Sequence, residues 1–224
     1  MRESMSMKIA VIDYGMGNLR SVTHALEHVA PEATIQLSSD PAVIAAADKI
    51  VFPGQGAMRD CMRELLARDL RPAVLAAAAS KPFLGICVGA QLLFELSEEG
   101  GNTPALGLFP GQVRRFEAER MVAADGSRLK VPHMGWNEVW QTRPHPLWQG
   151  IADGSRFYFV HSYYMDTPDA ALPVGRSDYP FPFTVAVARA NIFATQFHPE
   201  KSHAAGLQLL KNFVAWDGTV QPAQ

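Results

Sequence analysis

The first hundred residues alternate between short apolar runs and longer segments with helical periodicity. The runs predict strands at residues 9–13, 34–37, 49–52 and 83–86, and the periodic segments predict helices at residues 19–29, 58–66, 73–79 and 90–96. Strands that are apolar throughout and separated by helices are typical of a parallel sheet covered on both faces. This pattern restricts the chain to an α/β fold, in which ligands collect at the carboxyl ends of the strands.

The second half of the chain has a different pattern, with alternating or aromatic-rich segments joined by turns that contain proline and glycine. These segments predict mixed or antiparallel strands at residues 112–116, 131–140, 157–164, 184–190 and 192–197. A final amphipathic helix is expected at about residues 203–216, with Leu207, Leu210 and Val214 on one stripe. No repeat or linker is visible, so we expect one domain over residues 1–218 and a loose tail at residues 219–224.

Composition excludes several classes of protein. The 224 residues carry a formal net charge of −2 and no basic field, so neither nucleic acid nor an anionic membrane is an expected partner. Two cysteines cannot form a disulfide framework. Met1, Met5 and Met7 are each a plausible start. The polar residues that follow them run directly into a predicted strand, without the apolar region of a signal peptide. We therefore expect a cytoplasmic protein without a membrane-spanning segment.

Cys87 lies at the end of an apolar strand, in the string Gly85-Ile-Cys-Val-Gly89. A cysteine on a sharp turn from strand to helix, with glycine two residues before and after it, has the pattern of a nucleophile elbow. Free N–H groups at the start of the following helix would favour the thiolate. The alternative is a small buried apolar residue, which is the ordinary role of a free cysteine.

A thiol nucleophile needs a base, and the base needs a group that orients it. The apolar segment at residues 192–197 ends at His198, and Glu200 follows two residues later on the same face of an extended chain. Cys87, His198 and Glu200 therefore form a candidate triad. A surface turn with an incidental pair is one alternative. A metal site with His203 is another, but Pro199 and the five-residue gap do not fit helical ligand spacing.

Attack of a thiolate on a carbonyl also needs donors for the oxyanion. The N–H of Val88 follows the nucleophile directly, and the loop Pro53-Gly-Gln-Gly56 follows a neighbouring strand. Glycine can turn an N–H through backbone angles closed to other residues, so Gly54 and Gly56 are candidate sources of the second donor. The alternative for this tetrapeptide is an ordinary turn between strand and helix.

Two further patterns receive a structural interpretation. The glycine-rich string that begins at Gly15 resembles a dinucleotide-binding fingerprint, but Arg20 stands where the third glycine belongs, which argues against a cofactor site. The tryptophans are expected in the core rather than around a cofactor. They are Trp136, Trp140, Trp148 and Trp216.

The assembled motifs resemble those of the class I (triad) glutamine amidotransferases. Gly85-Ile-Cys-Val-Gly-Ala-Gln91 and Gln196-Phe-His-Pro-Glu200 match that family in pattern and order. The resemblance implies a flavodoxin-like fold, with a central, mostly parallel sheet, helices on both faces and added mixed or antiparallel strands. It implies Cys87 as nucleophile, His198 as general base and acid, and Glu200 as the orienting carboxylate.

The same resemblance implies where glutamine would be held, with no cofactor and no metal. Gly54, Gly56 and Val88 would form the oxyanion hole. The substrate would lie near Gly54 and near the residues Gly89, Gln91, His161, Ser162 and Tyr163.

Within the family, three more strings look like those of the glutaminase subunits of imidazole glycerol phosphate synthases, in histidine biosynthesis. They are Asp13-Tyr-Gly-Met-Gly-Asn-Leu-Arg-Ser-Val22, Pro132-His-Met-Gly-Trp-Asn137 and Phe159-Val-His-Ser-Tyr163. The resemblance implies a heterodimer with a separate (β/α)8-barrel cyclase. That partner would receive ammonia and make imidazole glycerol phosphate and aminoimidazole carboxamide ribotide. Asn18, Trp136 and Lys201 match the contact surface with the barrel.

Two alternatives remain open at this point. One is a glutaminase subunit of another synthase, such as anthranilate synthase, against which the strings at residues 13–18 and 134–137 argue. The other is a non-catalytic redox protein of the same fold, with Cys87 as a sensor thiol, against which intact His198 and Glu200 argue.

Overall fold

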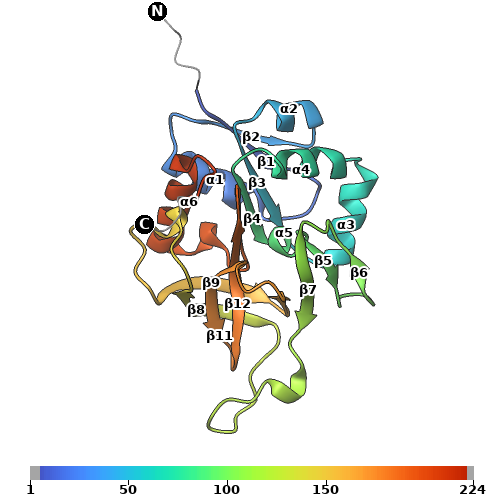
Figure 1. Cartoon of the computed structure of the whole chain (residues 1–224), viewed down its shortest axis with the longest axis vertical. Coiled ribbons are helices and arrows are strands. Elements are labelled where there is room, and N and C mark those ends of the chain that lie inside the picture. Colours follow the sequence, from blue (N-terminus) through green and yellow to red (C-terminus); the bar gives the residue numbers. More distant parts are fainter. Residues whose placement is uncertain (1–5, 221–224) are drawn as a thin grey trace, which may run out of the picture.

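A sheet of 13 strands runs through the computed structural model, which describes residues 6–220 (Figure 1). Five strands form its parallel part, in the order β2-β1-β3-β4-β13. This is the flavodoxin-like order, in which the crevice beside β1 and β3 is the expected place for a ligand. Their bounds are β1 Lys8–Ile12, β2 Thr34–Ser38, β3 Lys49–Gly54, β4 Phe83–Cys87 and β13 Ile192–Thr195.

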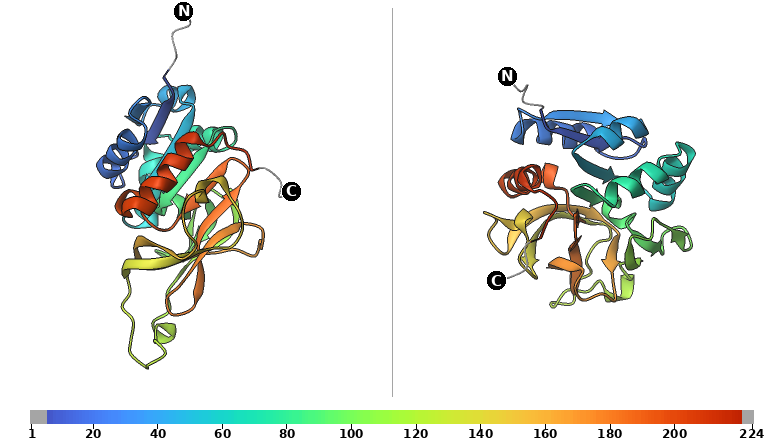
Figure 2. Two further views of the ribbon diagram at one scale, coloured as in Figure 1. Left: turned by 90° about the vertical axis from the view of Figure 1, so that its left-hand side faces the viewer. Right: turned by 45° about the horizontal axis from the view of Figure 1, so that its top comes forward.

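Helices cover both faces of this parallel part. Helices α1 (Leu19–Val29) and α6 (His203–Ala215) lie against each other on one face, and Figure 2 shows them side by side. Helices α2 (Pro41–Ala46), α3 (Met58–Ala67) and α4 (Arg71–Ala78) lie on the other face. Burial on both faces explains why β3 and β4 are apolar without alternation.

The sheet continues from β13 as mostly antiparallel strands, through β12, β10, β7, β5 and β6. A branch leaves β12 through β11 to β8 and β9. The bounds are β5 Phe94–Ser97, β6 Thr103–Pro104, β7 Phe109–Arg115, β8 His133–Gln141, β9 Ser155–His161, β10 Tyr163–Asp166, β11 Pro173–Asp178 and β12 Pro182–Arg189. The predicted α/β class with added antiparallel strands is confirmed.

The prediction of a helix at residues 90–96 is wrong. Helix α5 covers only Val88–Gln91, and the chain turns back into strand β5. Phe94 lies opposite Phe109 of β7, with the ring centroids 5.8 Å apart. Leucine and phenylalanine in this stretch are compatible with a helix, but pairing with a strand that comes later in the chain decides the conformation.

Three other expectations need correction. The predicted strand at 157–164 divides at Ser162 into β9 and β10, and the short helix α2 was not predicted. Trp148 and Trp216 are buried as expected, but Trp136 and Trp140 are 42% and 45% exposed. In α6, Leu210 and Val214 are buried, whereas Leu207 is only partly so.

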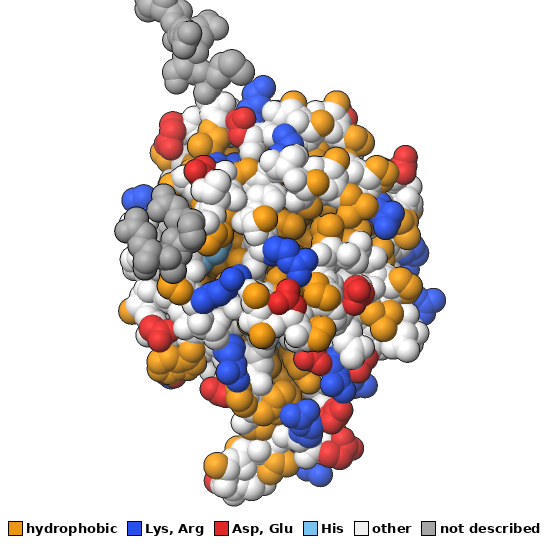
Figure 3. Space-filling model, in the orientation of Figure 1, with side chains coloured by type: hydrophobic (Ala, Val, Ile, Leu, Met, Phe, Trp, Pro, Cys, Tyr) orange, Lys and Arg blue, Asp and Glu red, His pale blue; other side chains and the backbone are white. Residues whose placement is uncertain are grey.

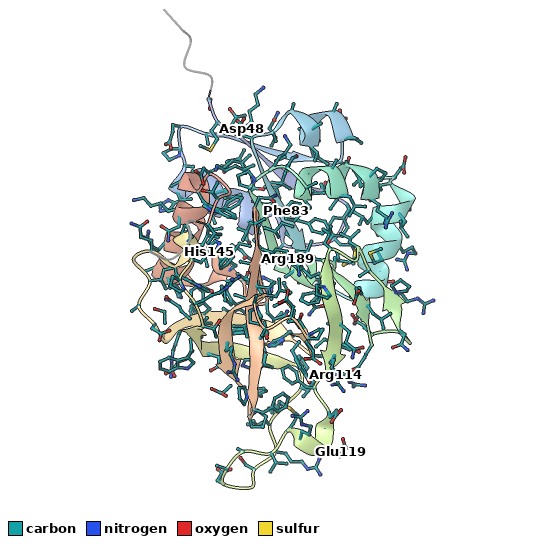
Figure 4. The ribbon with its side chains drawn as sticks, viewed as in Figure 1. Asp48, Phe83, Arg114, Glu119, His145 and Arg189 are labelled. Atoms are coloured by element: carbon teal, nitrogen blue, oxygen red, sulfur yellow. The ribbon has the colours of Figure 1, made fainter. Side chains whose placement is uncertain are left out.

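The segment between β7 and β8 projects from the end of the molecule and contains the short 3-10 helix η1 (Ala118–Arg120); Figure 4 marks its position by Glu119. On the face drawn in Figure 3, basic and acidic side chains are interspersed without a field of one sign. No helix within residues 6–220 is both long and apolar enough to cross a membrane. The single domain at 1–218 stays a prediction, and residues 221–224 of the predicted tail lie outside the described part.

Candidate active site

Cys87 ends β4 on a strained turn. Its φ of +55° is a conformation that non-glycine residues rarely adopt, and the residue is only 3% exposed. Gly89 explains how the turn packs: a Cβ there would stand 1.9 Å from the carbonyl oxygen of Phe52. Glycine at position 89, two residues after Cys87, therefore lets the elbow lie directly against β3.

His198 is brought to Cys87 because β13 and β4 are parallel neighbours, with Thr195 opposite Ile86. Both chains leave the sheet at the same edge. The N–H of His198 donates to the carbonyl oxygen of Tyr158 at 2.9 Å, and the Ser202 hydroxyl donates to the carbonyl oxygen of His198 at 2.6 Å. These bonds fix the backbone that carries the imidazole.

Glu200 orients that imidazole. Its Oε1 lies 2.8 Å from His198 Nδ1, and the two side chains are 0% and 3% exposed. Because a carboxylate oxygen can only accept a hydrogen bond, Nδ1 of the His198 imidazole carries a proton. Nε2 is then the ring nitrogen available to exchange a proton with the substrate. Nε2 of His198 makes no hydrogen bond within residues 6–220.

Electrostatics favour a charged His198. Burial alone lowers the pKa of the imidazole, but the neighbouring Cys87 thiolate and the Glu200 carboxylate outweigh it and raise the pKa to about 10. The arrangement therefore favours the protonated form of the His198 imidazole. The expectation that a helix favours the thiolate has less support, since α5 is only four residues long.

The predicted oxyanion residues surround Cys87. Gly54 lies opposite Cys87 in the β3–β4 ladder, and Gly56 has a φ of +89° that glycine tolerates. Val88 is the first residue of α5, so its N–H has no acceptor within the helix. Gly56 and Val88 line the cleft with Cys87, whereas Gly54 packs beneath the elbow, and the role of all three as oxyanion donors stays a prediction.

A cleft of about 300 Å³ opens above Cys87. Gln91, His161, Ser162 and Tyr163, which were predicted to bind substrate, line it. Gly54 and Gly89 do not; they pack beneath the elbow instead. The complete lining is Gln55, Gly56, Cys87, Val88, Gln91, Glu99, Pro132, Val160, His161, Ser162 and Tyr163.

Glu99 is a cleft residue that the sequence analysis missed. Its Oε2 accepts the N–H of Met58, the first residue of α3, at 2.7 Å, which fixes the carboxylate at the cleft. The spacing of Glu99 from Cys87 could not reveal it, because the wrongly predicted helix at 90–96 hid the turn that returns the chain to the site.

Two buried amides connect the cleft to the thiol: Gln91, which was predicted to bind substrate, and Gln196, whose part in the site was missed. Gln91 Nε2 donates to Gln196 Oε1 at 3.0 Å, and Gln196 Nε2 points to Cys87 Sγ at 3.9 Å. Gln196 is fully buried. Its place two residues before His198 on an extended chain was the signal that could have found it, since alternate residues share a face.

His133 supports His161 from behind the cleft. His161 Nδ1 donates to the Tyr163 carbonyl oxygen at 2.8 Å, so His161 Nε2 accepts from His133 Nδ1 at 2.9 Å. Burial lowers the pKa of His161 to about 3 and that of His133 to about 4. Both rings are therefore neutral at neutral pH, and His161 presents a fixed tautomer to the cleft wall.

Of the three predicted partner-contact residues, Asn18 follows β1, Trp136 lies on β8 and Lys201 follows β13. Asn18 precedes α1, and Trp136 stacks on His203 with ring centroids 5.0 Å apart. Lys201 Nζ lies 5.9 Å from the centroid of the Tyr158 ring. His203, the third residue of the alternative metal site, thus packs on Trp136. Residues 6–220 contain no group of three or more His, Cys, Asp or Glu that could hold a metal ion.

The comparison with protein families agrees with this geometry. The model of the glutamine amidotransferase class-I family matches residues 10–216. The imidazole glycerol phosphate synthase subunit HisH of Dechloromonas aromatica is 69% identical over 93% of this chain and 96% of its own length. The HisH subunit of Aromatoleum aromaticum is 67% identical over 93% and 98%.

Solved structures of lower identity share the fold. One of them, a glutamine amidotransferase, has a TM-score of 0.68 at 17% identity, covering 92% of this chain and 97% of that one. PurLQS from Thermotoga maritima has a TM-score of 0.65 at 19% identity, covering 94% and 99%. These structures share the fold, and the family model together with the HisH relatives shows that the chain belongs to the class I glutamine amidotransferase family.

Proposed function

We propose that Cys87, His198 and Glu200 carry out the glutaminase reaction of this HisH-type enzyme. The observation that carries the proposal is the enclosed His198–Glu200 pair beside Cys87, with the imidazole Nε2 unpaired among the described residues. Glutamine enters with its side-chain amide toward Cys87. Hydrolysis gives glutamate and ammonia.

In the first half-reaction, the Cys87 thiolate attacks the carbonyl carbon of the side-chain amide. An Sγ–C bond forms, and the negative charge passes to the carbonyl oxygen, where N–H groups of Val88 and of the Gly54–Gly56 loop can stabilise it. The charged His198 then donates its Nε2 proton to the departing nitrogen. The C–N bond breaks, ammonia leaves, and a γ-glutamyl thioester remains on Cys87.

In the second half-reaction, His198 changes from acid to base. The thioester carries no charge, so the thiolate that raised the pKa of His198 is gone and burial again opposes protonation. The neutral imidazole takes a proton from water, which attacks the thioester. The Sγ–C bond breaks and the Cys87 thiolate leaves, while the proton taken from water stays on His198, which restores the thiolate–imidazolium pair. Glutamate leaves, and its new γ-carboxyl group releases its own proton to solvent.

The cleft wall provides contacts for the amino-acid part of glutamine. We propose that Glu99 receives the α-ammonium group, because it is the one carboxylate among the cleft residues and its position is fixed by Met58. Gln91 and the segment His161–Tyr163 provide polar groups for the rest of the substrate.

We propose further that ammonia passes to a separate (β/α)8-barrel cyclase subunit, in a cytoplasmic heterodimer. Free ammonia at neutral pH would be protonated and lost as a nucleophile, so direct transfer is useful. The relatives named as synthase subunits support a partner, and the exposed Trp136 with Lys201 offers a surface for it. The comparisons do not favour a subunit of anthranilate synthase or a non-catalytic redox protein.

Glutamate release tests this function. The chain is mixed with a cyclase subunit of this synthase class, and glutamate is measured with and without the nucleotide substrate of the cyclase. We expect low activity for the chain alone and stimulation in the loaded complex, since the 53–56 loop needs the partner to orient its donors. High activity without the partner would contradict the latency. Absence of glutamate release in the loaded complex would contradict the function itself.

A further inference from the structure

Gln196 is a buried amide beside the nucleophile, and the reaction described above does not use it. The residue is 0% exposed and lies between the end of β13 and His198. Its side-chain Oε1 accepts from Gln91 Nε2 at 3.0 Å, and its Nε2 donates to Cys87 Sγ at 3.9 Å. Within residues 6–220, the sulfur is the only hydrogen-bond acceptor of this buried NH2 group.

The backbone that carries Gln196 is fixed to a neighbouring strand. The N–H of Gln196 donates to the carbonyl oxygen of Val185 on β12 at 2.8 Å. Two residues later, the N–H of His198 donates to the carbonyl oxygen of Tyr158 on β9 at 2.9 Å. The amide and the imidazole are therefore both carried by a segment whose path is set by the sheet.

Gln91 and Tyr163 determine which end of the Gln196 amide faces the sulfur. Gln91 Nε2 lies 3.5 Å from the carbonyl oxygen of Tyr163, an atom that can only accept, so the NH2 end of Gln91 points that way. The same NH2 group donates to Gln196 Oε1. Because the carbonyl end of Gln196 is occupied in this way, its NH2 end is directed at Cys87 Sγ.

The chemistry of sulfur decides which form of Cys87 this amide favours. A thiol sulfur is a weak acceptor, whereas a thiolate carries a full charge and accepts a charge-assisted hydrogen bond. A buried NH2 group without another acceptor has lost its hydration, and a thiolate compensates for that loss better than a thiol does. In surroundings of low dielectric, the N–H dipole of Gln196 acts on the sulfur at 3.9 Å.

We infer that the Gln196 amide is a fixed donor to Cys87 Sγ that stabilises the thiolate, and that Gln91 is a positioning residue that keeps this amide in the required orientation. The inference deepens the proposed function and rests on it, because that reaction begins from the thiolate and regenerates it when the thioester is cleaved. Gln196 thus adds a neutral donor to the charged His198 beside the same sulfur.

The pH dependence of Cys87 alkylation tests this inference in the full-length chain. Chloroacetamide reacts with the thiolate, which displaces chloride, and mass spectrometry of the Cys87 peptide gives the rate between pH 4 and pH 9. Gln196→Met keeps the approximate length of the side chain and removes the amide. We expect the rising limb of the rate profile to move by about one unit toward higher pH, so that the rate on that limb falls about tenfold.

The alkylation rate on the high-pH plateau distinguishes loss of the donor from a disturbed elbow. A less stabilised thiolate is a stronger nucleophile, so the plateau rate in Gln196→Met should stay constant or rise by up to about threefold. A disturbed elbow would lower the rate at every pH.

The other titratable groups around Cys87 are the same in both proteins. They are Tyr14, Cys61, Glu99, His161, Tyr163, His198 and Glu200. Burial raises the pKa of Cys61 to about 11, raises the pKa of both tyrosines and lowers the pKa of His161 to about 3, so these four groups stay neutral across the measured range. A displaced limb in Gln196→Met therefore reports the amide.

Two further variants complete the test. Gln91→Met leaves the donor in place but removes the bond that fixes its orientation, so we expect a displacement about half as large in the same direction. Gln208→Met is the matched control, with the profile of the wild type. Gln208 on α6 also donates an amide hydrogen bond to another amide, Asn212 Oδ1 at 2.8 Å, but lies outside the cleft.

The results separate this inference from the function on which it rests. Superimposable profiles in the wild type and Gln196→Met would overturn the donor role, and so would a rate that falls equally at every pH. A wild-type profile in Gln91→Met would overturn the positioning role of Gln91. Alkylation needs no glutamine, so the proposed function is judged separately, by glutamate release from the wild-type complex. A displaced limb without glutamate release would contradict that function and support the donor role of Gln196.

Discussion

The parallel and the antiparallel parts of the sheet contribute different things to one site. Strands β3 and β4 are buried at every position, whereas β9 alternates between buried and partly exposed residues. The parallel part holds the strained Cys87 and the loop that serves it. The antiparallel part supplies the cleft wall at His161–Tyr163 and the exposed Trp136. Close packing thus positions the Cys87 sulfur, and the more open part forms the cleft wall and the exposed surface to which we propose that substrate and partner bind.

The triad lies at the junction between these two parts. Strand β13 is parallel to β4 on one side and antiparallel to β12 on the other, and its continuation carries His198. Cys87 and His198 therefore follow neighbouring strands, although 111 positions separate them along the sequence. Changes at the junction should affect catalysis most, and changes far from it should affect mainly stability.

Glu200→Gln, at the junction of the two parts, should reduce glutaminase activity more than the next three substitutions. The amide keeps the shape of the side chain but loses the charge that orients and supports the His198 imidazolium. We expect kcat to fall by about 100- to 10,000-fold, with little change in KM. Steady-state glutamate release measures it. Glu138→Gln, in an exposed pair with Arg156, is the control; an equal loss there would contradict the account.

Gly89→Ala tests the packing of the parallel part. The new Cβ would meet the rigid carbonyl of Phe52, so we expect a loss of about 3 kcal/mol in the free energy of unfolding and a strong loss of glutaminase activity. Urea unfolding measures the first quantity. Gly126→Ala, where the Cβ meets nothing within 4 Å, should cost only about 1 kcal/mol for its positive φ. Equal costs would argue against tight packing beneath the elbow.

Glu99→Gln tests the cleft wall rather than the reacting atoms. Loss of the charge that would pair with the α-ammonium group should raise KM about tenfold and leave kcat within about threefold. Glu95→Gln is a matched control, because Glu95 also accepts a backbone N–H, that of Gly111 at 2.9 Å, but lies outside the cleft. A fall in kcat with unchanged KM would place Glu99 in the chemical step instead.

His145→Asn should have the smallest effect, on stability at acidic pH. Burial lowers the pKa of His145 to about 4, so the unfolded chain binds a proton between about pH 6.5 and 4 that the folded chain does not. Stability must then decrease as pH falls through that range, by about 2 kcal/mol at pH 5. Asparagine keeps an acceptor for the Leu147 N–H.

Urea unfolding at pH 7 and pH 5 measures the effect of His145→Asn. The variant should lose less stability between the two pH values than the parent chain. His24→Asn, on the exposed side of α1, serves as control. Equal pH dependence in all three proteins would show that burial of His145 does not contribute.

Local sequence was a good guide where one local pattern decides the conformation. The parallel strands and helix α1 follow from apolar runs and helical periodicity, and the elbow follows from Gly85 and Gly89 around Cys87. The triad residues could also be found, because strand ends on a parallel sheet converge at one edge. Their roles as nucleophile, base and orienting group stay predictions.

Where distant strands decide the conformation, the sequence was a poor guide. Residues 90–96 have a helical composition, but Phe94 packs on Phe109 in a strand pair, and this error hid Glu99. Trp136 and Trp140 were expected in the core, but they occupy exposed positions on β8. No local pattern distinguishes a buried aromatic side chain from one on an open antiparallel strand.

The central claim is that Cys87 releases ammonia from glutamine for a cyclase subunit. Its most direct test uses Cys87→Ala in the complex with that subunit. Synthesis of imidazole glycerol phosphate is measured once with glutamine and once with added ammonium salt. The alanine removes only the sulfur at the junction of the two parts of the sheet. The account predicts that glutamine-dependent synthesis falls by at least about 1,000-fold, while ammonia-dependent synthesis continues at the wild-type rate. Unchanged glutamine-dependent synthesis would contradict it.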